Sequence, residues 1–284
     1  MRHLDLFSGI GGFALAARWM GWETVAFCEC EPYCQKVLKK HWPDVPIIND
    51  IREITDATIT NADKREGGSR AESESIKASQ FQLGANKSNY YTIDIITGGF
   101  PCQPFSNAGK RNGTTDNRFL WPEMLRVIRL FKPEWVVAEN VPGILTIENG
   151  LVFERVCTDL EGEGYTVQAV VIPAVSKNAK HRRDRVWFVA ESRQKRFTTT
   201  EENKQLERSR SGINNNRDGR AKRKPTNESR WLPEPAVGRV ANGIPCRVDR
   251  LKALGNAIVP QVAYEIFKAI EEAEHEHCRT NTRS

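Results

Sequence analysis

Four side chains in the sequence are suited to covalent and acid–base chemistry. Cys102 stands in a loop framed by glycine and proline, GGFPCQPFS at residues 98–106. A free thiol has a pKa of about 8.5, so a nucleophilic cysteine needs cationic neighbours. Arg183 and Arg185 could supply them, because side chains two residues apart on a strand point to one face. Glu139 follows an apolar run, where burial would favour a carboxylic acid that can donate a proton.

A glycine-rich turn, SGIGG at residues 8–12, could hold a nucleoside. Its glycines allow a tight turn and bring a ligand close to a helix N-terminus. Glu29 ends a second apolar run, where a carboxylate can accept both hydroxyl groups of a ribose, and Asp50 follows a third, where it could accept from an adenine amino group. The sequence GIGGFA at 9–14 also satisfies a loose dinucleotide fingerprint, so a nicotinamide-dependent oxidoreductase remains an alternative at this point.

The elements that must position these residues alternate between strand and helix patterns. This alternation predicts a doubly wound α/β fold with a mostly parallel, seven-stranded sheet. The predicted strands are 3–7, 24–29, 47–49, 93–97, 135–138, 167–172 and 185–190. Apolar residues at three- and four-residue spacing predict helices at 13–20, 32–41, 121–131, 151–162 and 258–274, and the last is expected to pack back on the sheet.

Two polar stretches, residues 56–89 and 192–229, interrupt this rhythm and lack aliphatic periodicity. Residues 193–230 contain 12 basic and five acidic side chains, whereas the whole chain has a formal net charge of +6. A local cationic stretch on a nearly neutral body predicts a polyanionic partner, most commonly nucleic acid. A solvated charged loop remains the alternative.

Composition excludes several classes of protein. The 284 residues are 39% hydrophobic and 27% charged, which is enough to bury a large core. The sequence has neither a run of 18 apolar residues nor a secretory signal, so we expect a cytoplasmic protein without a membrane partner. Seven scattered cysteines match neither a disulfide framework nor a zinc site, and we expect no metal. The three at positions 28, 30 and 34 are interpreted as small apolar side chains.

Five motifs in order resemble those of the DNA (cytosine-5) methyltransferase family. DLFSGIGGF at residues 5–13 is similar to its cofactor motif, FPCQPFS at 100–106 to its catalytic Pro-Cys loop, and ENV at 139–141 to its acidic motif. RRDR at 182–185 resembles its arginine motif, and GNAIVP at 255–260 its last motif, which closes the cofactor pocket. The resemblance implies a Rossmann-like fold that uses S-adenosylmethionine.

The resemblance also implies how the chain is divided. A catalytic and cofactor-binding domain would span residues 1–190 and contain the polar insert 56–89. Residues 191–250 would form a target-recognition region, reduced in size and largely basic, that contributes phosphate contacts more than base readout. Residues 251–284 would carry the last motif and a helix that packs back on the catalytic domain.

The resemblance further implies a reaction on a cytosine flipped out of its duplex. Cys102 would add to C6 of the base while Glu139 engages N3 and the amino group. Arg183 would hold the base and keep Cys102 ionised, with Arg185 as a second contact. Phe7 would stack on the adenine of the cofactor. The implied cofactor-binding residues are Asp5, Phe7, Ser8, Gly9, Gly11, Gly12, Glu29, Asp50, Leu120 and Asn256.

The expected partner is double-stranded DNA, bound by a monomer. The enzyme would act either as the modification half of a restriction pair, with a cognate restriction endonuclease as a further partner, or as an orphan methyltransferase of a phage or bacterium. Two alternatives remain open from the sequence: an RNA cytosine-5 methyltransferase, and a nucleic-acid-binding protein that keeps the fold without turnover. The nicotinamide enzyme is disfavoured, because it leaves the Pro-Cys loop and the ENV motif unexplained.

Overall fold

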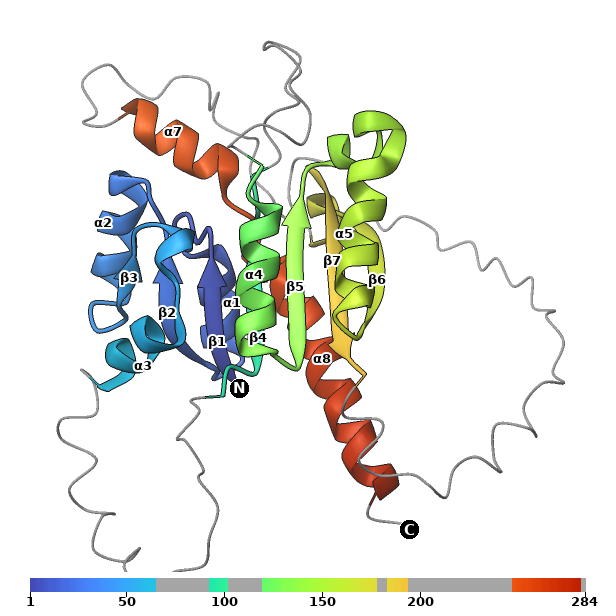
Figure 1. The fold of residues 1–284 in the computed structure, drawn as a ribbon. Helices are drawn as coiled ribbons and strands as arrows, with labels where there is room; N and C mark the ends of the chain where they lie inside the picture. The colour runs from blue at the N-terminus through green and yellow to red at the C-terminus, as the bar shows by residue number, and fades with distance from the viewer. Residues whose placement is uncertain (65–91, 102–118, 178–182, 194–246, 282–284) are drawn as a thin grey trace, which may run out of the picture.

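The computed structural model of this protein describes residues 1–64, 92–101, 119–177, 183–193 and 247–281, and the statements below concern these residues (Figure 1). Cys102 and residues 194–230 of the basic stretch lie outside the described residues. The strands and longer helices, in chain order, are β1 (Arg2–Leu6), α1 (Gly12–Trp19), β2 (Glu23–Cys28), α2 (Pro32–His41), β3 (Ile47–Ile48), α3 (Asp56–Lys64), β4 (Ile95–Gly98), α4 (Trp121–Phe131), β5 (Trp135–Asn140), α5 (Leu151–Gly162), β6 (Tyr165–Pro173), β7 (Asp184–Ser192), α7 (Arg247–Asn256) and α8 (Pro260–Asn281). Short 3-10 helices connect several of them: η1 (Ile51–Glu53), η5 (Pro142–Leu145), η6 (Ile147–Gly150) and η7 (Ala174–Lys177).

The seven strands form one sheet in the order β3-β2-β1-β4-β5-β7-β6. The first five strands of this order pair in parallel, and β7 runs antiparallel to both β5 and β6. The prediction of a mostly parallel, seven-stranded sheet is therefore confirmed. The parallel strands end at one edge, where doubly wound sheets bind their ligands.

Helices cover both faces of the sheet (Figure 1). On one face α3, α4 and α5 bury a large apolar cluster that includes Ile59, Met124 and Val156. On the other face α1 and α8 enclose Phe13, Trp187 and Phe267, and α2 adds Leu38 against Phe27. The helices that the sequence predicted thus bury the apolar stripes that their periods indicate.

The helix bounds agree closely with the sequence prediction at residues 32–41, 121–131 and 151–162. The sequence predicted no helix at the start of the polar insert, where the structure forms helix α3. Thr55 begins this helix, because its hydroxyl accepts a hydrogen bond from the backbone N–H of Thr58 at 3.2 Å. Ile59 then anchors the helix, with 1% of its surface exposed. Prediction from periodicity needs several apolar residues at helical spacing, and one capping residue with one buried side chain does not provide them.

Two glycines of the turn after β1 offer a matched test of stability. Gly9 and Gly11 both adopt left-handed backbone angles, with φ of +55° and +86°. A Cβ at Gly9 would meet nothing within 4 Å, whereas one at Gly11 would lie 2.7 Å from the Trp42 ring. Gly9→Ala should lower the free energy of unfolding by about 1 kcal/mol, and Gly11→Ala by about 3 kcal/mol, because steric overlap adds to the backbone strain. Urea denaturation measures both values, and equal losses would contradict the role of Trp42.

Candidate active site

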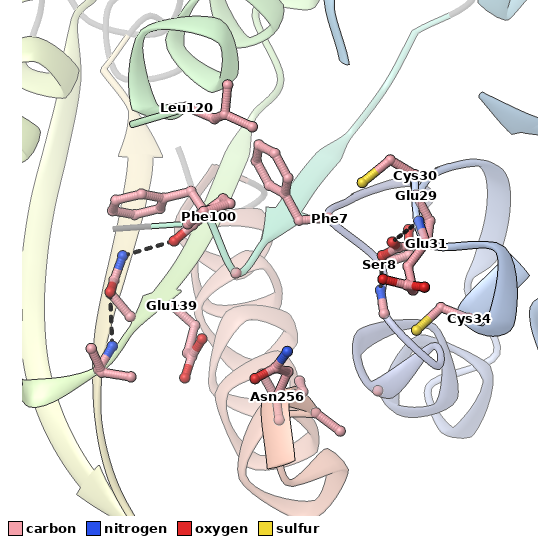
Figure 2. A pocket seen from close by; sticks show the side chains of 18 of the residues that line it. Phe7, Ser8, Glu29, Cys30, Glu31, Cys34, Phe100, Leu120, Glu139 and Asn256 are labelled. Carbon is pink, nitrogen blue, oxygen red and sulfur yellow. Dashed lines mark hydrogen bonds between the residues drawn. The ribbon is translucent and has the colours of Figure 1, made fainter. Parts of the chain in front are cut away.

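A cavity of about 1240 Å³ lies at the edge where β1, β2, β4 and β5 end (Figure 2). The last residues of these strands and the residues that follow them line it, together with α7 and the turn that follows α7. Strand ends, a glycine turn and a helix from the C-terminal part of the chain therefore surround one space. This is the place that the doubly wound topology predicts for a ligand.

The glycine turn and Glu29 form one wall of this cavity. The backbone N–H of Gly9 donates to one oxygen of the Glu29 carboxylate at 2.6 Å, and the N–H of Glu31 donates to the other at 2.7 Å. These two bonds fix the carboxylate, as Figure 2 shows. A carboxylate has about four acceptor sites, so both oxygens can still accept a hydrogen bond from a ligand.

Three of the residues predicted to bind the cofactor support this wall through contacts within the protein. Asp5 is fully buried in β1 and does not line the cavity; its carboxylate accepts from the Thr97 hydroxyl at 2.9 Å. Burial raises the pKa of Asp5 to about 8, although the bond from Thr97 opposes the shift. Gly11 faces Trp42 and lines a smaller, adjoining cavity. Ser8 lines the main cavity, but its hydroxyl donates to the Asp5 carbonyl at 2.7 Å.

Phe7, Leu120 and Asp50 line the part of the cavity next to this wall. Phe7 has a left-handed backbone with φ of +53°, which is strained for a bulky residue and is typical of functional sites. This conformation leaves the ring at the cavity, where Figure 2 shows it near Leu120. The Asp50 carboxylate accepts from the backbone N–H of Arg52 at 2.9 Å, which fixes the start of η1.

Glu139 and Arg185 form the opposite wall. The sequence predicted Glu139 just after a strand, but the structure places it inside β5. Only 7% of its surface is exposed. Nε of Arg185, on β7, lies 2.8 Å from its carboxylate. Burial raises the pKa of Glu139 to about 7, while the charges of Arg185 and Arg183 and the hydrogen bond from Arg185 oppose the increase. Near neutral pH this carboxyl group can therefore hold or release a proton.

The first residues of the Pro-Cys loop lie beside Glu139. A Cβ at Gly99 would lie 3.1 Å from a Glu139 carboxylate oxygen. The Asn140 amide donates to the Phe100 carbonyl at 2.9 Å, and its oxygen accepts from the N–H of Val141 (Figure 2). Asn140 thus ties the start of the loop to the strand that carries the acid. The site prediction omitted Asn140, although the ENV motif contained the signal.

Arg183 does not lie where the sequence predicted. Its guanidinium group donates to the carbonyl groups of Gly255 and Ala257 and lines the smaller cavity. β7 begins at Asp184, and Arg183 has a left-handed φ of +38°, so the alternation of a strand does not extend to it. The prediction that Arg183 and Arg185 share one face was therefore wrong.

The structure brings most of the predicted residues to one cavity. Its lining includes Phe7, Ser8, Gly9, Gly12, Glu29, Asp50, Leu120, Asn256, Glu139 and Arg185. Asp5, Gly11 and Arg183 do not line it, and Cys102 lies outside the described residues.

The lining suits S-adenosylmethionine. A fixed carboxylate, an aromatic ring and a second carboxylate on three successive strand ends match a ribose, an adenine ring and its amino group. The volume also leaves room for a base next to Glu139. Among the described side chains, no three His, Cys, Asp or Glu residues are grouped to hold a metal ion.

Known proteins match the chain over most of its length. The model of the family described as C-5 cytosine-specific DNA methylase matches residues 1–68 and 72–232. Type II methyltransferase M.AquIA of Picosynechococcus sp. is 33% identical over 204 residues, which cover 68% of this chain and 73% of that protein. M.HgiCII of Herpetosiphon aurantiacus is 30% identical over 189 residues, which cover 66% of this chain. M.HhaI of Haemophilus parahaemolyticus is 29% identical over 190 residues, again 66% of this chain.

The matches span only 36% of M.HgiCII and 48% of M.HhaI, so the chain corresponds to about a third to a half of those relatives. A solved structure, described as a DNA modification methyltransferase encoded within a prophage (E. coli), matches with a TM-score of 0.52 and 22% identity. That match covers 69% of this chain and 48% of the other, and it supports the fold. On the strength of the family match and the similarity to M.AquIA, this chain belongs to the C-5 cytosine-specific DNA methylase family.

Proposed function

We propose that this protein transfers a methyl group from S-adenosylmethionine to C5 of a cytosine in double-stranded DNA, through a covalent adduct with Cys102. The observation that carries the proposal is the ion pair of buried Glu139 with half-buried Arg185, which faces the same cavity as the fixed Glu29 carboxylate. The start of the Pro-Cys loop lies next to Glu139 and so supports a nearby Cys102.

The chain's own residues would perform each proton and electron movement. The thiolate of Cys102 forms a bond to C6 of the cytosine, and the displaced electron pair moves toward C5 as Glu139 protonates N3. Arg185 holds the Glu139 carboxyl group in place and faces the base. When bound, S-adenosylmethionine would supply an electrophilic methyl group; C5 would take it as the methyl–sulfonium bond breaks, which leaves S-adenosylhomocysteine. C5 then loses its proton to solvent, the sulfur leaves C6, and N3 returns its proton to Glu139.

The target base must leave its stack to reach this cavity, which costs a few kcal/mol. Lys and Arg contacts to phosphates supply affinity for such a step. We assign these phosphate contacts to the basic stretch 193–230. All of its residues except Arg193 lie outside the described residues. We further propose a cytoplasmic monomer that acts with a cognate restriction endonuclease. Within the described part of the chain, every helix is too short or too polar to cross a membrane.

Transfer of a labelled methyl group to defined polymers tests the proposal. Purified protein is incubated with labelled S-adenosylmethionine and either duplex DNA of mixed sequence or transfer RNA, and the product nucleosides are separated. We expect label in 5-methylcytosine from DNA. Label only in transfer RNA would overturn the choice of DNA. Cofactor binding without label in either polymer would favour the non-catalytic alternative.

A further inference from the structure

The side chain of Arg183, the residue before β7, bonds to the turn that carries Asn256. Nη2 of Arg183 donates to the carbonyl oxygen of Gly255 at 2.7 Å and to that of Ala257 at 2.5 Å. These carbonyl groups stand on either side of Asn256, which lines the main cavity. One guanidinium nitrogen therefore fixes the backbone before and after a cavity residue.

The two carbonyl groups need such a partner. Gly255 belongs to the last turn of α7, where the carbonyl groups find no backbone N–H donor within the helix. Ala257 lies in the connection to α8. An arginine at a helix C-terminus satisfies these carbonyl groups and interacts favourably with the helix dipole. Arg183 is also half-buried, so water competes less for its bonds than at an exposed site.

A second link to α7, the ion pair of Lys252 with Glu31, is weaker because it is exposed to solvent. Lys252 donates to the Glu31 carboxylate at 2.8 Å, but 61% of the Lys252 side chain is exposed. Exposed ion pairs contribute little, in the range of about 0 to 1 kcal/mol. Arg183 therefore adds a polar link on both sides of Asn256 to the apolar contacts that Ile258 and Val259 make with the cluster between α1 and α8.

Arg183 and Arg185 differ in their hydrogen bonds and in the cavity that they line, although the charge of Arg183 still acts on Glu139. Arg183 lines the smaller cavity of about 510 Å³ with Gly11 and Ile258, whereas Arg185 lines the main cavity and contacts Glu139. Two arginines two positions apart thus serve different neighbours. Their substitution should affect different steps.

We propose that Arg183 is a positioning residue for the cofactor: it holds the Gly255–Ala257 turn so that Asn256 faces the cofactor part of the cavity, while Arg185 serves the target base. The inference rests on the proposed function, because it takes S-adenosylmethionine as the ligand. It assigns to Arg183 a role in cofactor affinity in place of direct contact with the cytosine.

Calorimetric titration with S-adenosylmethionine and with S-adenosylhomocysteine tests this role without any turnover. We expect Arg183→Ala to raise the Kd of both about tenfold and Arg183→Lys to raise it less, because an ammonium group can still donate to two carbonyl oxygens. Arg185→Ala is the matched control, with a Kd within about twofold of wild type and a lower kcat. Thermal unfolding of each variant identifies any loss of folding, and Arg183→Lys keeps the test usable if the alanine variant unfolds.

A double-mutant cycle with Asn256→Ala tests whether Arg183 acts through that residue. Because Arg183 would act by placing Asn256, the double variant should bind the cofactor about as weakly as the weaker single variant. Independent effects that multiply, or an unchanged Kd in folded Arg183→Ala, would overturn the inference. If the wild type binds neither compound, the proposed function itself fails, and the two failures are thus distinguished.

Discussion

Replacing Cys102 by serine is expected to lower the rate of methyl transfer at least about 10⁴-fold. A hydroxyl group is hardly ionised near neutral pH, whereas a cysteine supplies a thiolate that can attack C6 of the base. Without the covalent bond at C6, C5 stays a poor nucleophile. Single-turnover transfer of labelled methyl to DNA measures this loss. The cofactor Kd should stay within about twofold, because in the proposed mechanism the sulfur bonds to the base and not to the cofactor.

Cys157→Ser is the matched control. Cys157 is a half-buried thiol on α5 that does not line the main cavity. Its replacement should leave the rate unchanged. Cys30, an exposed thiol that does line the cavity, is the alternative nucleophile. Retained transfer in Cys102→Ser together with its loss in Cys30→Ser would contradict the proposed mechanism.

The second large effect is expected at Glu139. Glu139→Gln should reduce kcat about 10²- to 10⁴-fold, the range for loss of a general acid. The glutamine oxygen can still accept the hydrogen bond from Arg185, so the geometry of that wall is kept, but an amide cannot protonate N3. Measurement of kcat with duplex DNA gives the size of the loss, and Glu154→Gln, at an exposed position on α5, should leave kcat unchanged.

The raised pKa of Glu139 also predicts the direction in which activity changes with pH. Burial raises the pKa of Glu139 to about 7, so the carboxyl group is protonated below that pH and ionised above it. The kcat/KM of the wild type should therefore fall on the alkaline side of about 7 as the proton is lost. Glu139→Gln should lack this decline, since its amide does not titrate. Comparison of the two enzymes at each pH separates the Glu139 proton from other titrating groups. An alkaline decline of equal size in both enzymes would assign it to another residue.

Much of the fold could be predicted because most elements repeat their signal. Helix α4 presents buried Met124, Leu125 and Ile128 at helical spacing, and its bounds match the prediction. The reversal of β7 between β5 and β6 has no such signal, because neighbouring strands are chosen by packing across the whole sheet. Helix α3 was missed for the same reason: its support comes from contacts distant in sequence and not from its own period.

The site divides in a similar way. Glu29 and Glu139 stand at or near strand ends, so the topology alone places them at one edge. The backbone angle of Arg183 could not be predicted, because a left-handed arginine interrupts the alternation on which the prediction depended. Asp5 shows the limit of motifs: a residue within the cofactor motif is buried beneath the glycine turn and bonds to Thr97. A motif identifies the residues that a site needs, but not which of them touch the ligand.

The packing of α8 has a consequence for how the protein is made. Phe267 is fully buried against the rings of Phe13 and Trp22, and Glu271 accepts from the Trp22 indole at 2.9 Å across 249 positions of sequence. While the ribosome is still adding the intervening residues, these aromatic rings have no cover from α8. The nascent chain must therefore keep one face of its central strands open until residues 260–281 emerge, and for that period it presents the apolar surface that chaperones bind.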